Sequence, residues 1–115
     1  MDIKCASDVP AEAVQADGAV GVKIQWLVSS QDRPDNFYMR LFEIEPGGMT
    51  PRHAHAWEHE VFILAGEGTV RSGDRDRPIG PESVVHVRPG ELHQFQNTGA
   101  ETLRFLCLVP RTADY

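Results

Sequence analysis

Three of the five histidines in this chain of 115 residues fall within seven positions, shortly after a Gly-Gly turn signal. They are His53, His55 and His59. Neutral imidazole is a common protein ligand for transition metals. Because His53 and His55 are two positions apart, both side chains lie on one face of an extended segment and form a bidentate clamp. The spacing therefore predicts a metal site.

The remaining ligands require a bend and a second strand. A straight strand would carry His59 about 13 Å beyond His55, so residues 56–58 are expected to fold back. His93 comes much later, after a Pro-Gly turn signal and at the start of another predicted strand. We expect these histidines and His53 to converge on one metal. The fifth histidine lies mid-strand among valines and is expected to be structural.

Two neighbouring residues, His59 and Glu60, are candidates for the third metal ligand. On one strand adjacent residues point to opposite faces, so only one of them can reach the metal. Each shares its face with two large apolar residues of the segment 59–64, so hydrophobicity does not decide between them. Glu60 therefore stands as the alternative metal ligand.

Short strand-like segments, separated by glycine and proline, follow one another from residue 20 onward. Apolar residues alternate strictly from Val20 to Val28, which is the signal of a strand. The same criteria predict further strands at 37–45, 59–64, 69–71, 83–87, 93–97 and 102–109. No segment after residue 17 keeps a helical period. The pattern predicts an all-β sandwich or barrel in a single domain, residues 1–115.

Several of these strands, such as 59–64 and 103–108, are apolar on both faces. A small barrel buries only one face of a strand inside itself, so the other face needs a second layer. With the core barrel at about residues 19–110, that layer is either a second copy of the chain or the N-terminal segment 1–18. We expect a homodimer, with the segment 1–18 packing outside the barrel or across the dimer.

The composition limits the partners and the location of the protein. A formal net charge of −6 without a basic cluster argues against binding to nucleic acid or to an anionic membrane. No apolar run approaches the roughly 20 residues of a membrane helix, and the N-terminus lacks the pattern of an export signal. Cys5 and Cys107 are therefore expected to be reduced thiols in a cytoplasmic protein.

Two motifs in this sequence resemble those of the cupin superfamily. Residues 47–66 read G-x5-H-x-H-x3-H-E-x5-G, and residues 90–97 read G-x2-H-x3-N. The closest match is to small single-domain cupins of the conserved-barrel type, in which four histidines hold the metal. The resemblance implies a double-stranded β-helix, or jelly-roll, barrel that is often dimeric. It also favours His59 over Glu60 as the third ligand.

The second motif departs from the family pattern at two positions. Where the family usually has an opening glycine and, two residues before Gly90, a proline, this chain has Glu82 and Arg88. These positions shape a turn and the entry to a strand. Neither is a metal ligand, so the predicted ligand set is unaffected.

The resemblance implies a metal chemistry but not one activity. The subgroup prefers manganese or iron, although imidazole ligands also suit zinc, nickel and copper. We expect one divalent transition metal per chain, with two open positions for a small-molecule substrate and for dioxygen or peroxide. This favours an oxidoreductase of dioxygenase type. A small-molecule binding module without turnover and a structural zinc protein, with four histidines closing a tetrahedral site, are the alternatives.

Strand phase indicates the residues of a substrate pocket. Phe95 shares the metal face of its predicted strand, and Phe105 shares a face with Cys107. With Trp57 they would line an apolar cavity, and Arg40 is a candidate anchor for a carboxylate. Core packing of the phenylalanines and a surface position of the arginine are the simpler alternatives. A thiol near the metal would be exposed to oxidants formed there. No catalytic residue beyond the metal site is predicted.

Overall fold

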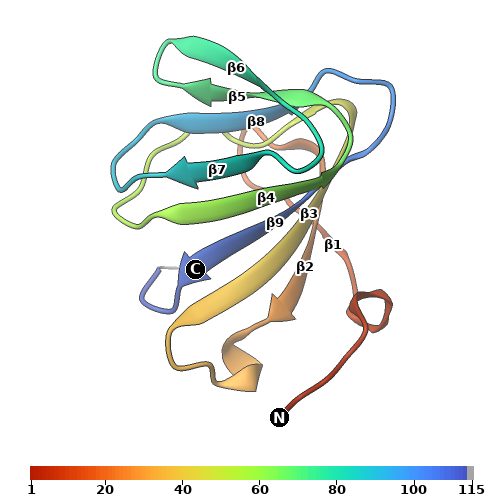
Figure 1. Ribbon diagram of the computed structural model, residues 1–115, viewed down its shortest axis with the longest axis vertical. Helices are drawn as coiled ribbons and strands as arrows, with labels where there is room; N and C mark the ends of the chain where they lie inside the picture. Colours follow the sequence, from red (N-terminus) through yellow and green to blue (C-terminus); the bar gives the residue numbers. More distant parts are fainter. Residues whose placement is uncertain (114–115) are drawn as a thin grey trace.

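The structure is a computed structural model and describes residues 1–113. Within this range the chain forms two short 3-10 helices and nine strands, which confirms the predicted all-β jelly-roll class (Figure 1). No helix in this range is long and apolar enough to cross a membrane. The elements are η1 (Ala6–Asp8), β1 (Glu12–Ala13), β2 (Val20–Val28), η2 (Ser30–Asp32), β3 (Phe37–Met49), β4 (His59–Ala65), β5 (Gly68–Ser72), β6 (Arg75–Ile79), β7 (Val84–Val87), β8 (His93–Asn97) and β9 (Leu103–Pro110).

The strands form one antiparallel sheet that curls on itself (Figure 1). The order along the sheet is β6-β5-β8-β3-β9-β4-β7, and β2 pairs with the opposite edge of β3 and with β1. The strand β3 is the longest, at 13 residues. It pairs with β2 and β9 along its length and reaches β8 at Met49. This strand therefore joins the part of the sheet that carries β8 to the part that carries β4.

Alternation along the strands decides which side chains face the interior. Every second residue of β9 is buried, which turns Phe105 and Cys107 inward. The same alternation in β8 buries His93, Phe95 and Asn97. Each fully buried aromatic or aliphatic side chain contributes about 1.5–3 kcal/mol through loss of apolar surface. The phase of these two strands thus brings the predicted site residues to the inside of the barrel.

Asn97, the last residue of the second motif, has a structural role. Its side-chain Nδ2 donates to the carbonyl oxygens of Ile44 and Glu101, each at 2.8 Å. Its Oδ1 accepts from the backbone N of Gly99 at 2.9 Å. The side chain is 3% exposed, and its bond to Ile44 is buried. Asn97 therefore closes the turn after β8 and ties it to β3.

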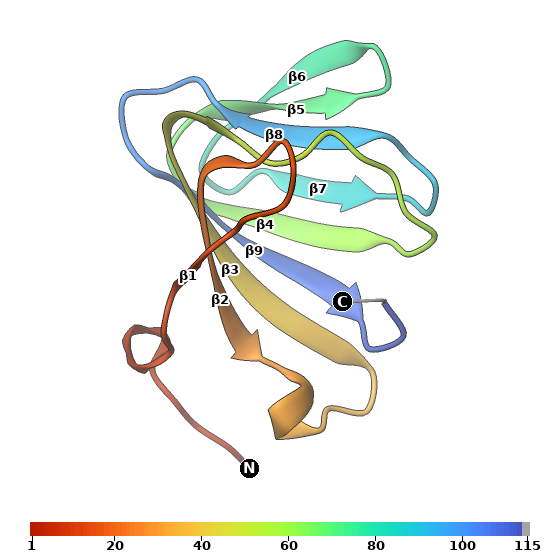
Figure 2. The ribbon, with the colours of Figure 1, turned by 180° about the vertical axis from the view of Figure 1, so that it is seen from behind.

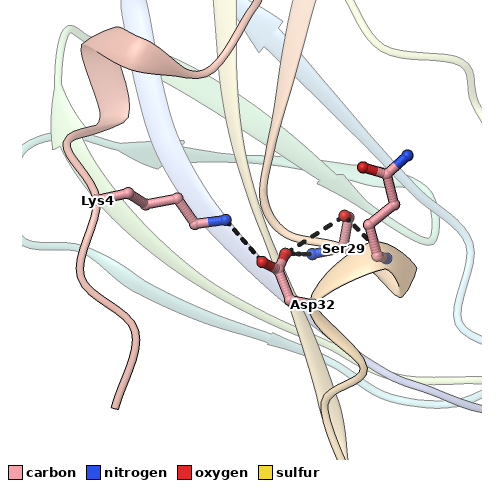
Figure 3. A network of polar contacts seen from close by, with 4 residues as sticks. Lys4, Ser29 and Asp32 are labelled. Carbon is pink, nitrogen blue, oxygen red and sulfur yellow. Dashed lines mark hydrogen bonds and ion pairs between the residues drawn. The ribbon is translucent and has the colours of Figure 1, made fainter.

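The N-terminal segment runs beside the chain's own β2, with which β1 pairs (Figure 2). Gln25 on β2 donates through Nε2 to the carbonyl oxygens of Ala6 and Val9, each at 2.8 Å. Figure 3 shows a second attachment, in which Lys4 Nζ lies 3.0 Å from Asp32 Oδ1 while Asp32 caps η2 by accepting from the backbone N of Ser29. Exposed ion pairs of this kind contribute about 0–1 kcal/mol.

The outer face of β4, β7 and β9 is apolar and uncovered in the single chain. Phe62, Leu64 and Val84 are exposed, and Leu106 and Leu108 are half-buried. Because the N-terminal segment lies beside β2, it does not cover these side chains.

Three local features were not predicted. The strand β6 was missed because its sequence, with three charged residues and Pro78, lacks an apolar alternation. Residues around His53 and His55 are not a strand but make a single bridge to β8. Glu82, at the position of the family's opening glycine, adopts a left-handed φ of 70°. This conformation costs a residue with a side chain roughly 1–2 kcal/mol, which explains why glycine suits the position.

Candidate metal centre

Three histidines bring their ring nitrogens together inside one end of the barrel. One ligand atom from each of His53, His55 and His93 lies within 4.8 Å of the others. The backbones of His53 and His93 exchange two hydrogen bonds, of 3.1 and 2.9 Å, which fix the loop before β4 against the start of β8. Three imidazoles this close together could hold one ion, so the donor set fits a transition metal.

The ring of His59 adjoins these three. Its Nε2 lies 3.3 Å from His55 Nε2, and its ring centre is 5.1 Å from that of His93. The backbone bends at Ala56 and Trp57, as predicted, and this bend turns His59 back toward the others. His59 is the first residue of β4 and, at 4% exposed, is buried on its inner face. We refer to His53, His55, His59 and His93 as the histidine cluster.

Glu60, the alternative ligand, lies on the opposite face of β4. It is exposed and stands beside Glu58 and His86, whose Nε2 is 2.6 Å from Glu58 Oε2. The neighbouring strand pairs Glu60 with His86 across the outer surface. The structure therefore brings His59 to the other three histidines and turns Glu60 away from them.

The electrostatic environment keeps the cluster in its neutral form. Burial is the largest cause in every case, and it lowers the pKa of His53 and His93, of His55 to about 4, and of His59 to about 2. For His59 the positive charge of Arg40 is the next cause, and it lowers the pKa further. Neutral imidazole is the form that binds metal, so no proton has to be displaced near neutral pH.

The tautomer of His93 also suits a metal ligand. Its Nδ1 lies 2.9 Å from the carbonyl oxygen of Glu91, so Nδ1 carries the proton and donates it. The lone pair is then on Nε2. Metal-bound histidines in proteins usually have such a partner behind the ring.

A cavity of about 540 Å³ opens beside the cluster and is lined by all four of its members. The predicted pocket residues Arg40, Phe95, Phe105 and Cys107 line it as well. Trp57 is not among the lining residues. Its indole instead stacks on His55, with ring centres 4.5 Å apart and planes 9° apart.

Sequence reasoning missed two aromatic walls of this cavity, Trp26 and Phe42. The alternation that predicted β2 places Trp26 on the same face as Val22 and Ile24, and Phe42 is in phase with Arg40. The inward direction of both side chains could therefore have been predicted from strand phase. The contribution of Val14, Ala16 and Asp17 to the cavity wall could not be predicted in this way, because it depends on the path of the N-terminal segment in the folded chain.

Arg40 is 4% exposed, so the simpler expectation of a surface arginine is wrong. Its guanidinium carbon lies 5.6 Å from the ring centre of Trp26 and 5.0 Å from that of Phe42. Its Nη2 reaches Cys107 Sγ at 3.0 Å and His59 Nδ1 at 3.3 Å. Burial raises the pKa of the Cys107 thiol, although Arg40 opposes this shift. A positive charge is thus held within the cavity wall, behind the histidine cluster.

A family model described as a cupin domain matches residues 40–109, more than half of the chain. The chain belongs to the cupin family. The matched range contains the whole histidine cluster and most of the cavity wall. The relatives of this cupin differ widely in what they do.

Among solved structures, the polyketide cyclase RemF from Streptomyces resistomycificus is similar over 96% of this chain and 79% of that chain, with a TM-score of 0.90 and 35% identity. The 1-methylthio-D-xylulose 5-phosphate methylsulfurylase of Rhodospirillum rubrum is 34% identical over 76 residues, which are 66% of this chain and 49% of that protein. The oxalate-binding protein of Thermotoga maritima is 36% identical over 74 residues, 61% of each chain. The chain thus spans about half to three-fifths of the length of these two curated relatives.

Acidification is predicted to destabilise the metal-free protein. In the unfolded chain a histidine takes up a proton near its ordinary pKa of about 6.5, whereas the folded cluster stays neutral to lower pH. The unfolded state therefore binds more protons below about pH 6.5, and the free energy of unfolding falls as the pH drops toward the folded pKa of His55, about 4. Urea unfolding at a series of pH values between 7.5 and 5, without metal, measures this slope. In a His55→Gln variant the slope should be shallower, and equal slopes in the two proteins would contradict the prediction.

Proposed function

We propose that this cupin is a metal-dependent enzyme that binds one divalent transition metal at the histidine cluster and a small organic substrate in the adjoining cavity. The observation that carries the proposal is the meeting of neutral imidazoles with one wall of an apolar, aromatic cavity. A purely structural metal would need no such cavity beside it.

Manganese or iron is the metal we propose, since the resemblance to four-histidine cupins favours them. Four neutral ligands leave the full charge of the ion in place and, in an octahedral complex, two positions open. A metal bound there would polarise a substrate oxygen as a Lewis acid or bring dioxygen beside the substrate.

The cavity walls favour a flat substrate that carries negative charge on oxygen. Phe95 stacks on Phe105 with ring centres 4.8 Å apart, and Phe105 stacks on Phe42 at 5.3 Å, so a continuous aromatic surface lines one side. Arg40 adds a buried positive charge to the wall. Phenolates, enolates and aromatic carboxylates combine the two features that this surface would recognise.

The reaction we propose first is oxidation of the dioxygenase type. It follows from the open positions that four neutral imidazoles would leave at a bound metal. The residues of the cavity would hold the substrate and exclude water, and a metal held by the histidine cluster would supply the redox chemistry.

A redox-neutral ring closure is the second candidate. The similarity to the polyketide cyclase RemF extends over 96% of this chain at 35% identity, which favours this reaction specifically. The substrate would be a chain with several carbonyl groups, and the aromatic walls would hold it folded. The two candidates use the same site and differ in whether dioxygen is consumed.

We also propose that the chain forms a homodimer through the outer face of β4, β7 and β9, where Phe62, Leu64 and Val84 are exposed. Covering this face would remove apolar surface from water at a gain of about 25 cal/mol per Å². Static light scattering at micromolar concentration should give twice the mass of one chain, and Phe62→Glu should give a monomer. Val20→Glu, on an exposed apolar residue of β2, is the control that should stay dimeric. A monomeric unaltered protein would contradict this proposal.

Protein purified without added metal is predicted to contain about one transition-metal ion per chain by elemental analysis, or to take it up on dialysis. Replacing His59 or His93 by alanine removes a ligand and should lower the affinity by more than the roughly 10- to 100-fold typical of partners that only support a ligand. Glu60→Ala, on the outer face, should keep wild-type metal content. Loss of metal from Glu60→Ala with retention in His59→Ala would overturn the ligand assignment.

Turnover is predicted for the manganese or iron form. An oxygen electrode should record consumption of dioxygen with a catechol, a diketone or a styrene, because dioxygen is a substrate of the first candidate reaction. The same incubations without oxygen, with an aromatic polycarbonyl compound followed by mass spectrometry, test ring closure as loss of water. Metal-free protein is the control. Tight binding of these compounds without any consumption would contradict an enzyme and favour a binding module.

A further inference from the structure

His59 differs from the other members of the histidine cluster in what lies behind its ring. Its Nε2 faces the cluster, 3.3 Å from His55 Nε2. Its Nδ1, at the other side of the ring, has two contacts: Arg40 Nη2 at 3.3 Å and Cys107 Sγ at 3.4 Å. All three of these side chains are 4% exposed, so water does not reach this contact freely.

The rules of donors and acceptors decide which contact supports a metal ligand. A neutral imidazole carries one N–H and one lone pair. If Nε2 gives its lone pair to a metal, the proton must be on Nδ1 and needs an acceptor. The guanidinium of Arg40 is a donor only. Within the described chain, the acceptor that remains for His59 is therefore the sulfur of Cys107.

The metal-free arrangement is satisfied by the opposite tautomer. With the proton on Nε2, His59 donates to His55 Nε2, and Arg40 donates to Nδ1. Binding of a metal at Nε2 ends both of these bonds and moves the proton to Nδ1. Arg40 stays bonded through its contact to Cys107 Sγ at 3.0 Å, so the sulfur then accepts from two donors.

We propose that Cys107 is a positioning residue of the metal site, whose sulfur accepts the Nδ1–H of His59 and so holds Nε2 ready for the metal. The inference rests on the proposed metal site. His93 has the same kind of support from the backbone carbonyl of Glu91, which no side-chain substitution removes. At His59 the acceptor is a side chain, so a substitution at Cys107 can remove it.

Zinc affinity, measured by competition with a chelator, tests the inference. Zinc suits imidazole ligands. Cys107→Ala removes the acceptor and should weaken binding roughly 10- to 100-fold, as for other partners behind metal-bound histidines. Cys107→Ser keeps an acceptor and should recover most of the loss. Cys5→Ala, at the exposed second cysteine, is the matched control and should bind as the unaltered protein does.

A second readout begins with the unaltered protein, where no variant has to fold. In the zinc-loaded unaltered protein, nitrogen-15 NMR of the histidine rings should show His59 protonated at Nδ1, with slow exchange of that proton. Zinc-loaded Cys107→Ala should show faster exchange at the same nitrogen. A proton on Nε2 of His59 in the zinc-loaded protein would overturn the inference.

The outcomes separate this inference from the function on which it rests. If His53→Ala loses zinc while Cys107→Ala binds as tightly as the unaltered protein, the metal site stands and the role of Cys107 is refuted. If the unaltered protein takes up no zinc, the metal site itself is wrong and the inference falls with it.

Discussion

The site depends on the two backbone hydrogen bonds that join His53 to His93. The loop that carries His53 and His55 is not a strand, and by itself it would have no fixed position. Its backbone is attached to β8 and the turn before it at three points, through Thr50 to Phe95, His53 to His93, and His55 to Gly90. These bonds set the distance between ligands that lie 40 residues apart in the sequence. The bend at Ala56 and Trp57 then returns the chain to the same place at His59.

Charge is the second constraint on this centre. The histidine cluster contains no carboxylate, and the buried Arg40 lies directly behind His59. A bound divalent ion would therefore share the barrel interior with a second positive charge. Burial keeps the imidazoles neutral, which limits the repulsion within the protein. A substrate with a negatively charged oxygen would offset the remaining repulsion between a bound ion and Arg40. This is the physical reason for favouring phenolates, enolates and carboxylates in the cavity.

Much of the architecture could be predicted because the strand signals are local. Alternation located β2, and strand phase placed Phe95, Phe105 and Cys107 inside the barrel. The choice between His59 and Glu60 could not be made from the residues alone, since both faces of β4 are apolar. Only the three-dimensional arrangement shows that the face of Phe62 is the outer one. The burial of Arg40 could not be predicted from the sequence either. Its guanidinium is enclosed by rings from β2 and β3, which meet only in the folded sheet.

The coordination sphere of the bound metal tests the central claim most directly. Anomalous diffraction from crystals of the metal-loaded protein, recorded at the absorption edge of that metal, should give one strong peak per chain inside the barrel. The peak should lie within bonding distance of one nitrogen from each of His53, His55, His59 and His93, with further positions open toward the cavity. A peak on the outer surface at Glu58, Glu60 and His86, where the structure also brings three potential ligands together, would contradict the account. So would an interior metal from which His59 is absent.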